Sequence, residues 1–294
     1  MRSLLYINHQ QKFFGGFNKN FSDSKFVLFG VPFDSTSSYR PGSRFGPSAI
    51  REASVNIETW SWRSNNDFEN IGTHDLGDLA IVHGDCNETI RRVSEVIKEI
   101  VNLKKIPIMI GGEHTITLGV AKSLKDITIL SFDAHFDMRY EYLSNKLSHA
   151  CIMRRIIEEI GSENTIVVGV RAACKEEIEF VKNNNIYFIS SKQINMNSAK
   201  NIGLILKEKL KNKKKIYISI DMDVLDPSYA PGVGNPEPEG ISVSALLDII
   251  EEVIDDRILG FDVVEVTPLY DNGITSIVAS KIIYEICCIA SRFI

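Results

Sequence analysis

Three separate stretches of the chain read as a buried strand that runs directly into metal-ligand side chains. They are IPIMIGGEHT (106–115), ITILSFDAHFD (127–137) and IYISIDMDVLD (216–226). Together they offer six candidate ligands, namely His114, Asp133, His135, Asp137, Asp221 and Asp223. An unpaired buried carboxylate is strongly destabilising, so a cluster of this kind requires cations. The pattern therefore predicts a fold that gathers several strand ends around two divalent ions.

Short apolar runs alternate with helical periods along most of the chain. Strands are predicted at 26–30, 106–110, 127–132, 165–169, 186–189, 216–221 and 260–264. These runs are rich in Val, Ile and Phe, which is typical of parallel strands covered on both faces. Amphipathic helices are predicted at 88–102, 151–160, 173–183, 197–211, 243–256 and 275–290. The alternation predicts an α/β fold with a doubly wound sheet of about eight strands, in a single domain over residues 1–294.

The six candidate ligands are expected to meet at one edge of this sheet. Side chains two residues apart in a strand point to the same side, so Asp133, His135 and Asp137 should converge. Ligands of open parallel sheets bind beyond the carboxyl ends of the strands. The set contains carboxylates and imidazoles but no thiolate, which suits Mn²⁺ or a related first-row ion. Two such ions about 3.5–4 Å apart would share a water and generate hydroxide near neutral pH.

Two Gly/Pro-rich loops, 34–48 and 226–240, are expected at the rim of the site. One competing interpretation concerns IYISIDMDV, which also fits the DxDxV pattern of aspartate-nucleophile phosphotransferases. It leaves His114 and the DAHFD cluster unexplained, so the two-metal hydrolase is the favoured interpretation.

Charge and cysteine usage narrow the possible partners and location. The net charge is −5, without a basic stripe interleaved with aromatic residues, so nucleic acid is not an expected partner. The five cysteines form no CxxC pair and are odd in number, which indicates a reduced, intracellular protein. The first residues do not fit a signal peptide, and no apolar run reaches the roughly 18 residues of a membrane helix. The expectation is a soluble, cytoplasmic protein that does not bind membranes.

The metal-ligand motifs belong to longer blocks that resemble a known family. GGEHT, SFDAHFD and SIDMDVLDPSYAPGVGNPEPEG look like the signature blocks of the ureohydrolase (arginase/agmatinase) family. RPGSRFGPSAIRE (40–52), THDLGDL (73–79) and FDVVEVTPLYD (261–271) resemble further blocks, in the expected order from about residue 26 to 290. The resemblance implies a three-layer α/β/α sandwich with a central, mostly eight-stranded parallel sheet.

The resemblance also implies a binuclear manganese site with two Mn²⁺ per subunit. One ion would be held by His114, Asp133, Asp137 and Asp221, and the other by Asp133, His135, Asp221 and Asp223. A metal-bridging hydroxide would attack the guanidinium carbon of the substrate, and the intermediate would collapse to urea and an amine.

Three further residues are given roles by the same resemblance. His149 matches the histidine that carries protons to the leaving amine, a task suited to a side chain that titrates near neutral pH. Glu265 matches the carboxylate that clamps the guanidinium of the substrate through parallel N–H bonds. Glu113 stands where arginases carry Asp, and it is expected to orient His114 or a neighbouring group without binding metal itself.

Departures from the arginase pattern favour a decarboxylated substrate. Arginases carry Asn where this chain has Arg139, and the Gly-Asn-x-His lead-in to the catalytic histidine is missing. The sequence therefore predicts an agmatinase-type enzyme that hydrolyses agmatine to putrescine and urea. Guanidinobutyrate, aminopropylagmatine and arginine stay open as alternative substrates, as does a non-catalytic metal-binding homologue. Glu141 is predicted to pair with the cationic tail of the substrate, and a homotrimer or homohexamer is expected from the resemblance.

Overall fold

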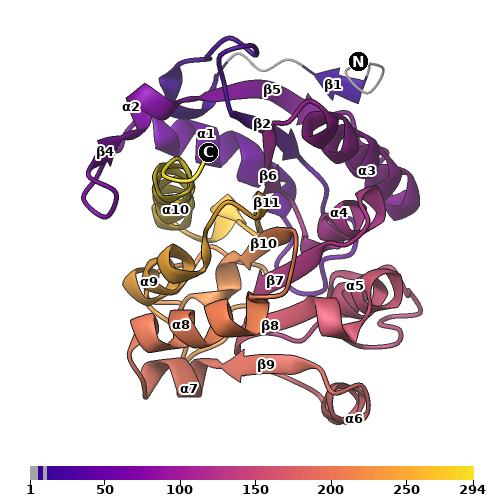
Figure 1. Cartoon of the computed structure of the whole chain (residues 1–294). Helices are drawn as coiled ribbons and strands as arrows, with labels where there is room; N and C mark the ends of the chain where they lie inside the picture. The colour runs from indigo at the N-terminus through magenta and orange to yellow at the C-terminus, as the bar shows by residue number, and fades with distance from the viewer. Residues whose placement is uncertain (1–5, 9–11) are drawn as a thin grey trace.

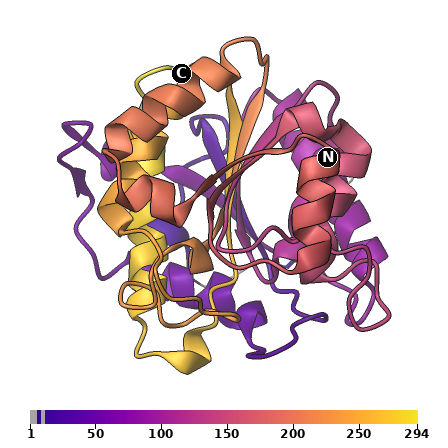
Figure 2. The same ribbon diagram turned by 90° about the horizontal axis from the view of Figure 1, so that it is seen from below.

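A computed structural model, which describes residues 6–8 and 12–294, shows a sheet between two layers of helices (Figures 1 and 2). The strands of the sheet are β1 (Ile7–Asn8), β2 (Phe26–Val31), β5 (Thr73–Leu79), β6 (Ile106–Gly111), β7 (Thr128–Phe132), β8 (Thr165–Val170), β9 (Tyr187–Ser190), β10 (Ile216–Asp221) and β11 (Ile258–Val264). Among the described residues these nine strands lie in the order β1-β5-β2-β6-β11-β10-β7-β8-β9. β1 is antiparallel to β5, and all other neighbours are parallel. The predicted parallel sheet is confirmed, with one short antiparallel strand added at its edge.

Helices cover both faces of the sheet. One layer holds α3 (Cys86–Asn102), α4 (Leu118–Ser123), α5 (Ile152–Ile160) and α6 (Lys175–Asn183). The other holds α1 (Gly46–Ser54), α2 (Phe68–Ile71), α7 (Ser191–Asn195), α8 (Ala199–Leu210), α9 (Val243–Val253) and α10 (Ile274–Ala290). The strands supply both layers by alternation, because successive side chains point to opposite faces. In β2, for example, Phe26 and Leu28 join one apolar cluster while Val27 and Phe29 join the other.

The central strands are buried along their whole length, as their apolar composition predicted. Every residue of β2, β6, β7, β8 and β10 is buried. Burial on both faces removes the alternating polar pattern of a half-exposed strand and leaves runs of Val, Ile and Phe.

Some elements differ from the sequence-based expectation. THDLGDL forms the strand β5, although its two aspartates hid this strand from the hydropathy pattern. The expected rim loop 34–48 ends earlier, because α1 begins at Gly46 with Pro47 in its first turn, where proline's missing N–H carries no penalty. A small separate ribbon joins β3 (Trp60–Ser61) to β4 (Asn66–Asp67). No helix in the described part of the chain is long and apolar enough to cross a membrane.

The strand order determines where a site can form. β6, β11, β10 and β7 lie side by side and parallel, so their carboxyl ends meet at one edge of the sheet. The chain passes from β6 to β7 across a gap that β10 and β11 fill later. Such a switch point is the usual place for a ligand site in an open α/β sheet.

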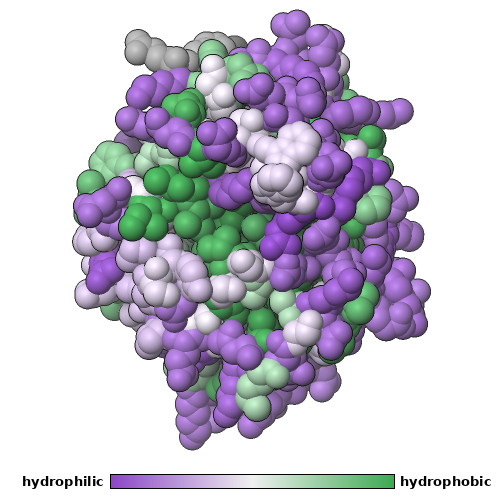
Figure 3. All heavy atoms as spheres, turned by 90° about the vertical axis from the view of Figure 1, so that its left-hand side faces the viewer, coloured by the Kyte–Doolittle hydropathy of each residue, from purple (hydrophilic) through white to green (hydrophobic). Residues whose placement is uncertain are grey.

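One side of the molecule carries a concentration of apolar residues. Figure 3 shows this side, the left-hand one in Figure 1, where α2 and α10 lie and where green residues gather at the centre. Exposed apolar side chains on α10 and near β3 include Ile274, Ile277 and Trp62, the last of which is 87% exposed.

Candidate metal centre and active site

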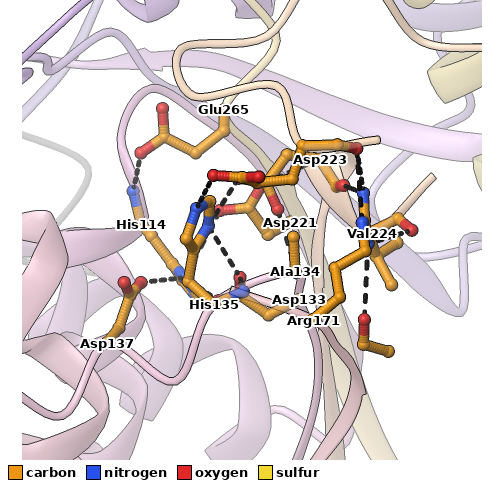
Figure 4. A network of polar contacts seen from close by, with 12 residues as sticks. His114, Asp133, Ala134, His135, Asp137, Arg171, Asp221, Asp223, Val224 and Glu265 are labelled. Atoms are coloured by element: carbon orange, nitrogen blue, oxygen red, sulfur yellow. Dashed lines mark hydrogen bonds and ion pairs between the residues drawn. The ribbon is translucent and has the colours of Figure 1, made fainter. Parts of the chain in front are cut away.

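A first group of ligand atoms surrounds the imidazole of His114, directly after β6. Its Nδ1 atom lies 3.1 Å from Asp133 Oδ2, 3.3 Å from Asp137 Oδ2 and 3.5 Å from Asp221 Oδ2. These side chains come from three different strand ends, and all of them are buried (Figure 4). The four residues therefore form one compact nitrogen and oxygen pocket.

A second group lies beside the first and shares Asp133 with it. His135 Nδ1 lies 3.0 Å from Asp223 Oδ2 and 3.6 Å from Asp133 Oδ1. Asp133 thus turns one oxygen toward His114 and the other toward His135. A carboxylate placed in this way is suited to bridge two cations.

The residues of both groups fit divalent cations. Ligand atoms of His114, Asp133 and Asp221 lie within 4.8 Å of one another, and so do those of Asp133, His135 and Asp223. Two of these atoms, His114 Nδ1 and Asp133 Oδ2, are buried and make no hydrogen bond to any described residue. Burial and the charge of Asp133 raise the pKa of Asp137 to about 7, and burial and the charges of Asp223 and Asp133 raise that of Asp221 well above its ordinary value. Cations would offset this excess of negative charge.

Local turns, rather than extended strands, bring these ligands together. β7 ends at Phe132, His135 forms only an isolated parallel bridge with Ala172, and Asp137 has a φ of 51°, so no continuous strand runs through residues 133–137. Asp221 closes β10, and its side chain accepts a hydrogen bond of 2.9 Å from the N–H of Asp223 in the following 3₁₀ turn. The ligands converge as expected, with turns after β7 and β10 rather than continuous strands carrying them.

The second ring nitrogen of His114 is held by a buried polar relay. Ser219 Oγ lies 3.1 Å from His114 Nε2 and donates its hydrogen to Asp262 Oδ1 at 2.6 Å. The other carboxylate oxygen of Asp262 accepts a hydrogen bond of 3.0 Å from Thr117. Since the hydroxyl hydrogen of Ser219 is used, its oxygen must accept from His114 Nε2–H. This places a proton on Nε2 and leaves Nδ1 as the ring nitrogen that faces the carboxylates and could bind a cation.

Glu265 stands at the end of β11 in a left-handed conformation, with a φ of 64°. Its N–H donates to the carbonyl of Gly112 at 2.8 Å, and its Oε1 accepts from the backbone N–H of His114 at 2.8 Å. A Cβ on Gly234 would stand only 3.2 Å from Oε2, so the glycine keeps that oxygen uncrowded. Burial and then the charge of Glu113 raise the pKa of Glu265 well above its ordinary value. A cationic partner would therefore stabilise the ionised form of this buried carboxylate.

His149 and Glu113 are connected through the hydroxyl of Thr36. Thr36 Oγ1 donates to Glu113 Oε1 at 2.8 Å and accepts from the backbone N–H of His149 at 2.9 Å. It also lies 3.3 Å from His149 Nδ1, while His149 Nε2 lies 3.1 Å from Ser38 Oγ. Glu113 thus contacts the loop that holds His149, and no hydrogen bond joins its carboxylate to the His114 ring among the described residues. Burial lowers the pKa of His149 to about 4, so its imidazole is neutral at neutral pH.

A cavity of about 430 Å³ leads to these residues. It is lined by Ser38, His135, Asp137, Arg139, Tyr142, His149, Ala150, Arg171, Ala172, Ala173, Glu177, Asn235 and Glu237. Residues 226–240 thus contribute to the rim, as expected. Glu141 is exposed and is not among the lining residues, although its neighbour Tyr142 is.

The chain was compared with families of known proteins. A family model described as the arginase family matches residues 24–288. The chain belongs to the arginase family.

Named relatives of this arginase-family chain are ureohydrolases. It is 37% identical to an agmatinase of Bacillus cereus, over 90% of this chain and 92% of the relative. It is also 37% identical to an N(1)-aminopropylagmatine ureohydrolase of Thermococcus kodakarensis, over 89% of each chain. A solved structure of the agmatine ureohydrolase of Thermoplasma volcanium superimposes with a TM-score of 0.89 at 37% identity, covering 99% of this chain and 98% of that one. These comparisons confirm the predicted ureohydrolase class of enzyme and its fold.

Several residues of this arginase-family site were missed by sequence reasoning. Ser219 and Asp262 carried a usable signal, because each is polar within an otherwise apolar buried strand. Thr36, Ser38 and Glu237 lie in loops, where polar residues are common, so only the structure reveals their contacts.

Proposed function

We propose that the chain is a binuclear manganese hydrolase that cleaves the guanidino group of agmatine to give putrescine and urea. The observation that carries this proposal is the pair of overlapping ligand groups that share Asp133 beside the carboxylate of Glu265. We further propose that the chain acts as one ureohydrolase domain over residues 1–294.

The proposed ligands are those predicted from the sequence. His114, Asp133, Asp137 and Asp221 would hold one ion, and Asp133, His135, Asp221 and Asp223 the other. Oxygen and imidazole ligands without thiolate favour Mn²⁺ among the common ions. When bound, two such ions would lower the pKa of a shared water and so supply a nucleophile near neutral pH.

The remaining side chains would position the substrate and move protons. With Oε1 of Glu265 engaged by the His114 N–H, its Oε2 is available to accept guanidinium N–H groups and to orient the reacting carbon. Neutral His149 can accept a proton on Nε2, where Ser38 now stands, and pass it to the leaving amine. Glu113 would support this step indirectly, by fixing Thr36 and therefore the backbone of His149.

Agmatine differs from the alternative substrates in the group at the far end of its tail. The relatives named above act on agmatine and on aminopropylagmatine, so both are candidates for this chain. A carboxylate near the cavity mouth would favour such amine tails. Glu141 stays a proposed partner of the tail, since it lies in the loop beside the lining residue Tyr142.

We also propose a cytoplasmic homotrimer or homohexamer. The side seen in Figure 3 carries exposed apolar residues, which often mark interfaces between subunits. All five cysteines are free thiols in the structure, as suits a reducing compartment. Light scattering should give three or six times the chain mass of 33.0 kDa. A monomer at micromolar concentration would contradict the proposed assembly.

The decisive experiment measures urea release by the Mn²⁺-loaded protein from agmatine, arginine, guanidinobutyrate and aminopropylagmatine. The proposal expects the highest kcat/KM with agmatine. The variant Asp221→Ala serves as a control that should lose both metal and activity. Preference for another substrate would keep the chemistry and change the specificity, whereas two bound metals without urea from any substrate would indicate a non-catalytic homologue.

A further inference from the structure

We propose that Glu237 forms an ammonium subsite, which binds the terminal amine of a guanidino substrate and selects amine tails over carboxylate tails. This inference rests on the proposed function and deepens it, because it names the residue that recognises the far end of the substrate.

Glu237 lines the cavity beside the metal-ligand cluster. Its Oε1 lies 3.8 Å from Nε2 of His135, whose Nδ1 lies 3.0 Å from Asp223 Oδ2. One imidazole ring therefore separates this carboxylate from the metal-ligand cluster. The tail of a guanidino group bound at Glu265 and the ligand cluster would extend into the cavity that Glu237 lines.

Among the charged groups lining the cavity, most are already engaged. Both carboxylate oxygens of Glu177 accept backbone N–H groups, those of Met138 and Cys174. Asp137 belongs to the metal-ligand group. The guanidinium of Arg139 lies over the ring of Tyr142, 5.1 Å from its centre. Glu237, in contrast, accepts no hydrogen bond from any side chain or backbone N–H of the described residues, and its side chain is 41% exposed. It is the lining carboxylate with free acceptor capacity.

Arg171 holds the backbone of Glu237 in position. Its guanidinium donates to the carbonyl of Glu237 at 2.8 Å and to that of Pro238 at 2.9 Å. The same group donates to the carbonyls of Asp223 at 2.6 Å and Val224 at 3.0 Å (Figure 4). One arginine therefore ties the loop of Glu237 to the loop of a metal ligand. Such a clamp fixes the subsite relative to the reacting centre before substrate binds.

The test compares two substrates of equal length and opposite tail charge, agmatine and 4-guanidinobutyrate. Urea release is measured for the Mn²⁺-loaded wild type and for the variants Glu237→Gln, Arg139→Gln and Glu239→Gln. Glu239 is the matched control, because it lies in the same loop, is exposed and does not line the cavity. Bound manganese is measured for each variant by elemental analysis, which shows whether Glu237 acts through His135 instead.

The inference expects Glu237→Gln to raise KM for agmatine by about tenfold or more, the effect of losing a charge-assisted hydrogen bond. Its KM for 4-guanidinobutyrate should stay equal or fall, its manganese content should not change, and Glu239→Gln should match the wild type. Equal effects on both substrates, or loss of manganese from Glu237→Gln, would overturn the inference while urea release upheld the function. The inference would also be overturned if the wild type preferred 4-guanidinobutyrate and Arg139→Gln lost that preference. No urea from either substrate would overturn the proposed function itself and this inference with it.

Discussion

His149 is a neutral imidazole held by hydroxyl groups at the mouth of the site. Thr36 gives its hydrogen to Glu113, so it can only accept from Nδ1–H of His149. This arrangement leaves the lone pair of Nε2 toward Ser38 and the cavity. Because burial keeps the pKa of this ring low, its role in the proposed reaction begins with accepting a proton.

The variant His149→Ala should keep both metals, since the ring nitrogens of His149 meet the hydroxyl groups of Thr36, Ser38 and Ser148, none of which is a proposed metal ligand. We expect kcat for agmatine to fall by about 100-fold or more, the scale of a lost general acid or base. Steady-state kinetics and elemental analysis check this result. The variant of the exposed His83, His83→Ala, is the control. Loss of manganese from His149→Ala would assign His149 a structural role.

A second residue-scale prediction concerns Ser219, which fixes the tautomer of His114. Replacing it with alanine removes the acceptor for Nε2–H and leaves Asp262 without its closest donor. Such partners of metal-binding histidines typically contribute about 10–100-fold to metal affinity. Ser219→Ala should therefore bind Mn²⁺ that much more weakly in calorimetry, with kcat little changed at saturating metal.

The neighbouring strand offers a matched control for this experiment. Ser131 pairs with Ser219 in register between β7 and β10, is equally buried, and makes no side-chain hydrogen bond to the described residues. Ser131→Ala should therefore leave the affinity for Mn²⁺ unchanged. Equal losses in both variants would show that packing, rather than the relay to His114, is responsible.

At the scale of elements, the site depends on how closely β6 approaches the segment after β2. Gly112 donates its N–H to the carbonyl of Val31, and Glu113 donates to that of Phe33. A Cβ on Gly112 would stand 1.8 Å from the carbonyl oxygen of Phe33, which no side-chain rotation relieves. The glycine therefore allows Glu113 and His114 to reach the site from the end of one strand.

Gly112→Ala should destabilise the protein by about 3 kcal/mol, the upper range for overpacking. It should also lower urea release, because the displaced segment carries both Glu113 and His114. Denaturant unfolding and kinetics measure the two effects. In Gly84→Ala the new Cβ meets no described atom within 4 Å, although φ is +78°. This control should cost about 1 kcal/mol from backbone strain alone. If both variants lost the same free energy of unfolding, the close contact between Gly112 and Phe33 would not be the cause.

The same elements show how far sequence reasoning reaches. Fully buried strands such as β6 and β10 were predictable because burial on both faces leaves an apolar run with a polar end. β5 was not predictable from hydropathy, because Asp75 and Asp78 are buried by pairing with a distant arginine. The candidate metal ligands could be picked out from their chemistry and their positions after apolar runs. Glu237 was not, because its place at the cavity depends on how Arg171 holds the loop.

At the scale of the whole molecule, Arg51 joins the α1 layer to β5, the strand next to the edge of the sheet. This arginine of α1 is only 1% exposed, and its Nε lies 2.7 Å from Asp75 Oδ2. Its Nη1 lies 2.6 Å from Asp78 Oδ1, and its Nη2 donates to Asp75 Oδ1 at 2.9 Å. α1 also leads out of the loop that carries Thr36 and Ser38, so this buried ion pair supports the wall of the active site from outside.

Arg51→Met should destabilise the protein by about 3–5 kcal/mol, because it leaves the buried carboxylate of Asp75 without its guanidinium. Arg51→Lys should lose nearly as much, since an ammonium cannot make the parallel pair of bonds to Asp75. Lys122→Met is the control: its ion pair with Glu159 is 42% and 40% exposed, so it should cost about 1 kcal/mol or less. Denaturant unfolding of the metal-free protein measures all three, which separates the effect from metal binding. Wild-type stability in Arg51→Met would mean that desolvation cancels the pairing energy, and that the helical layer is held to the sheet by apolar packing alone.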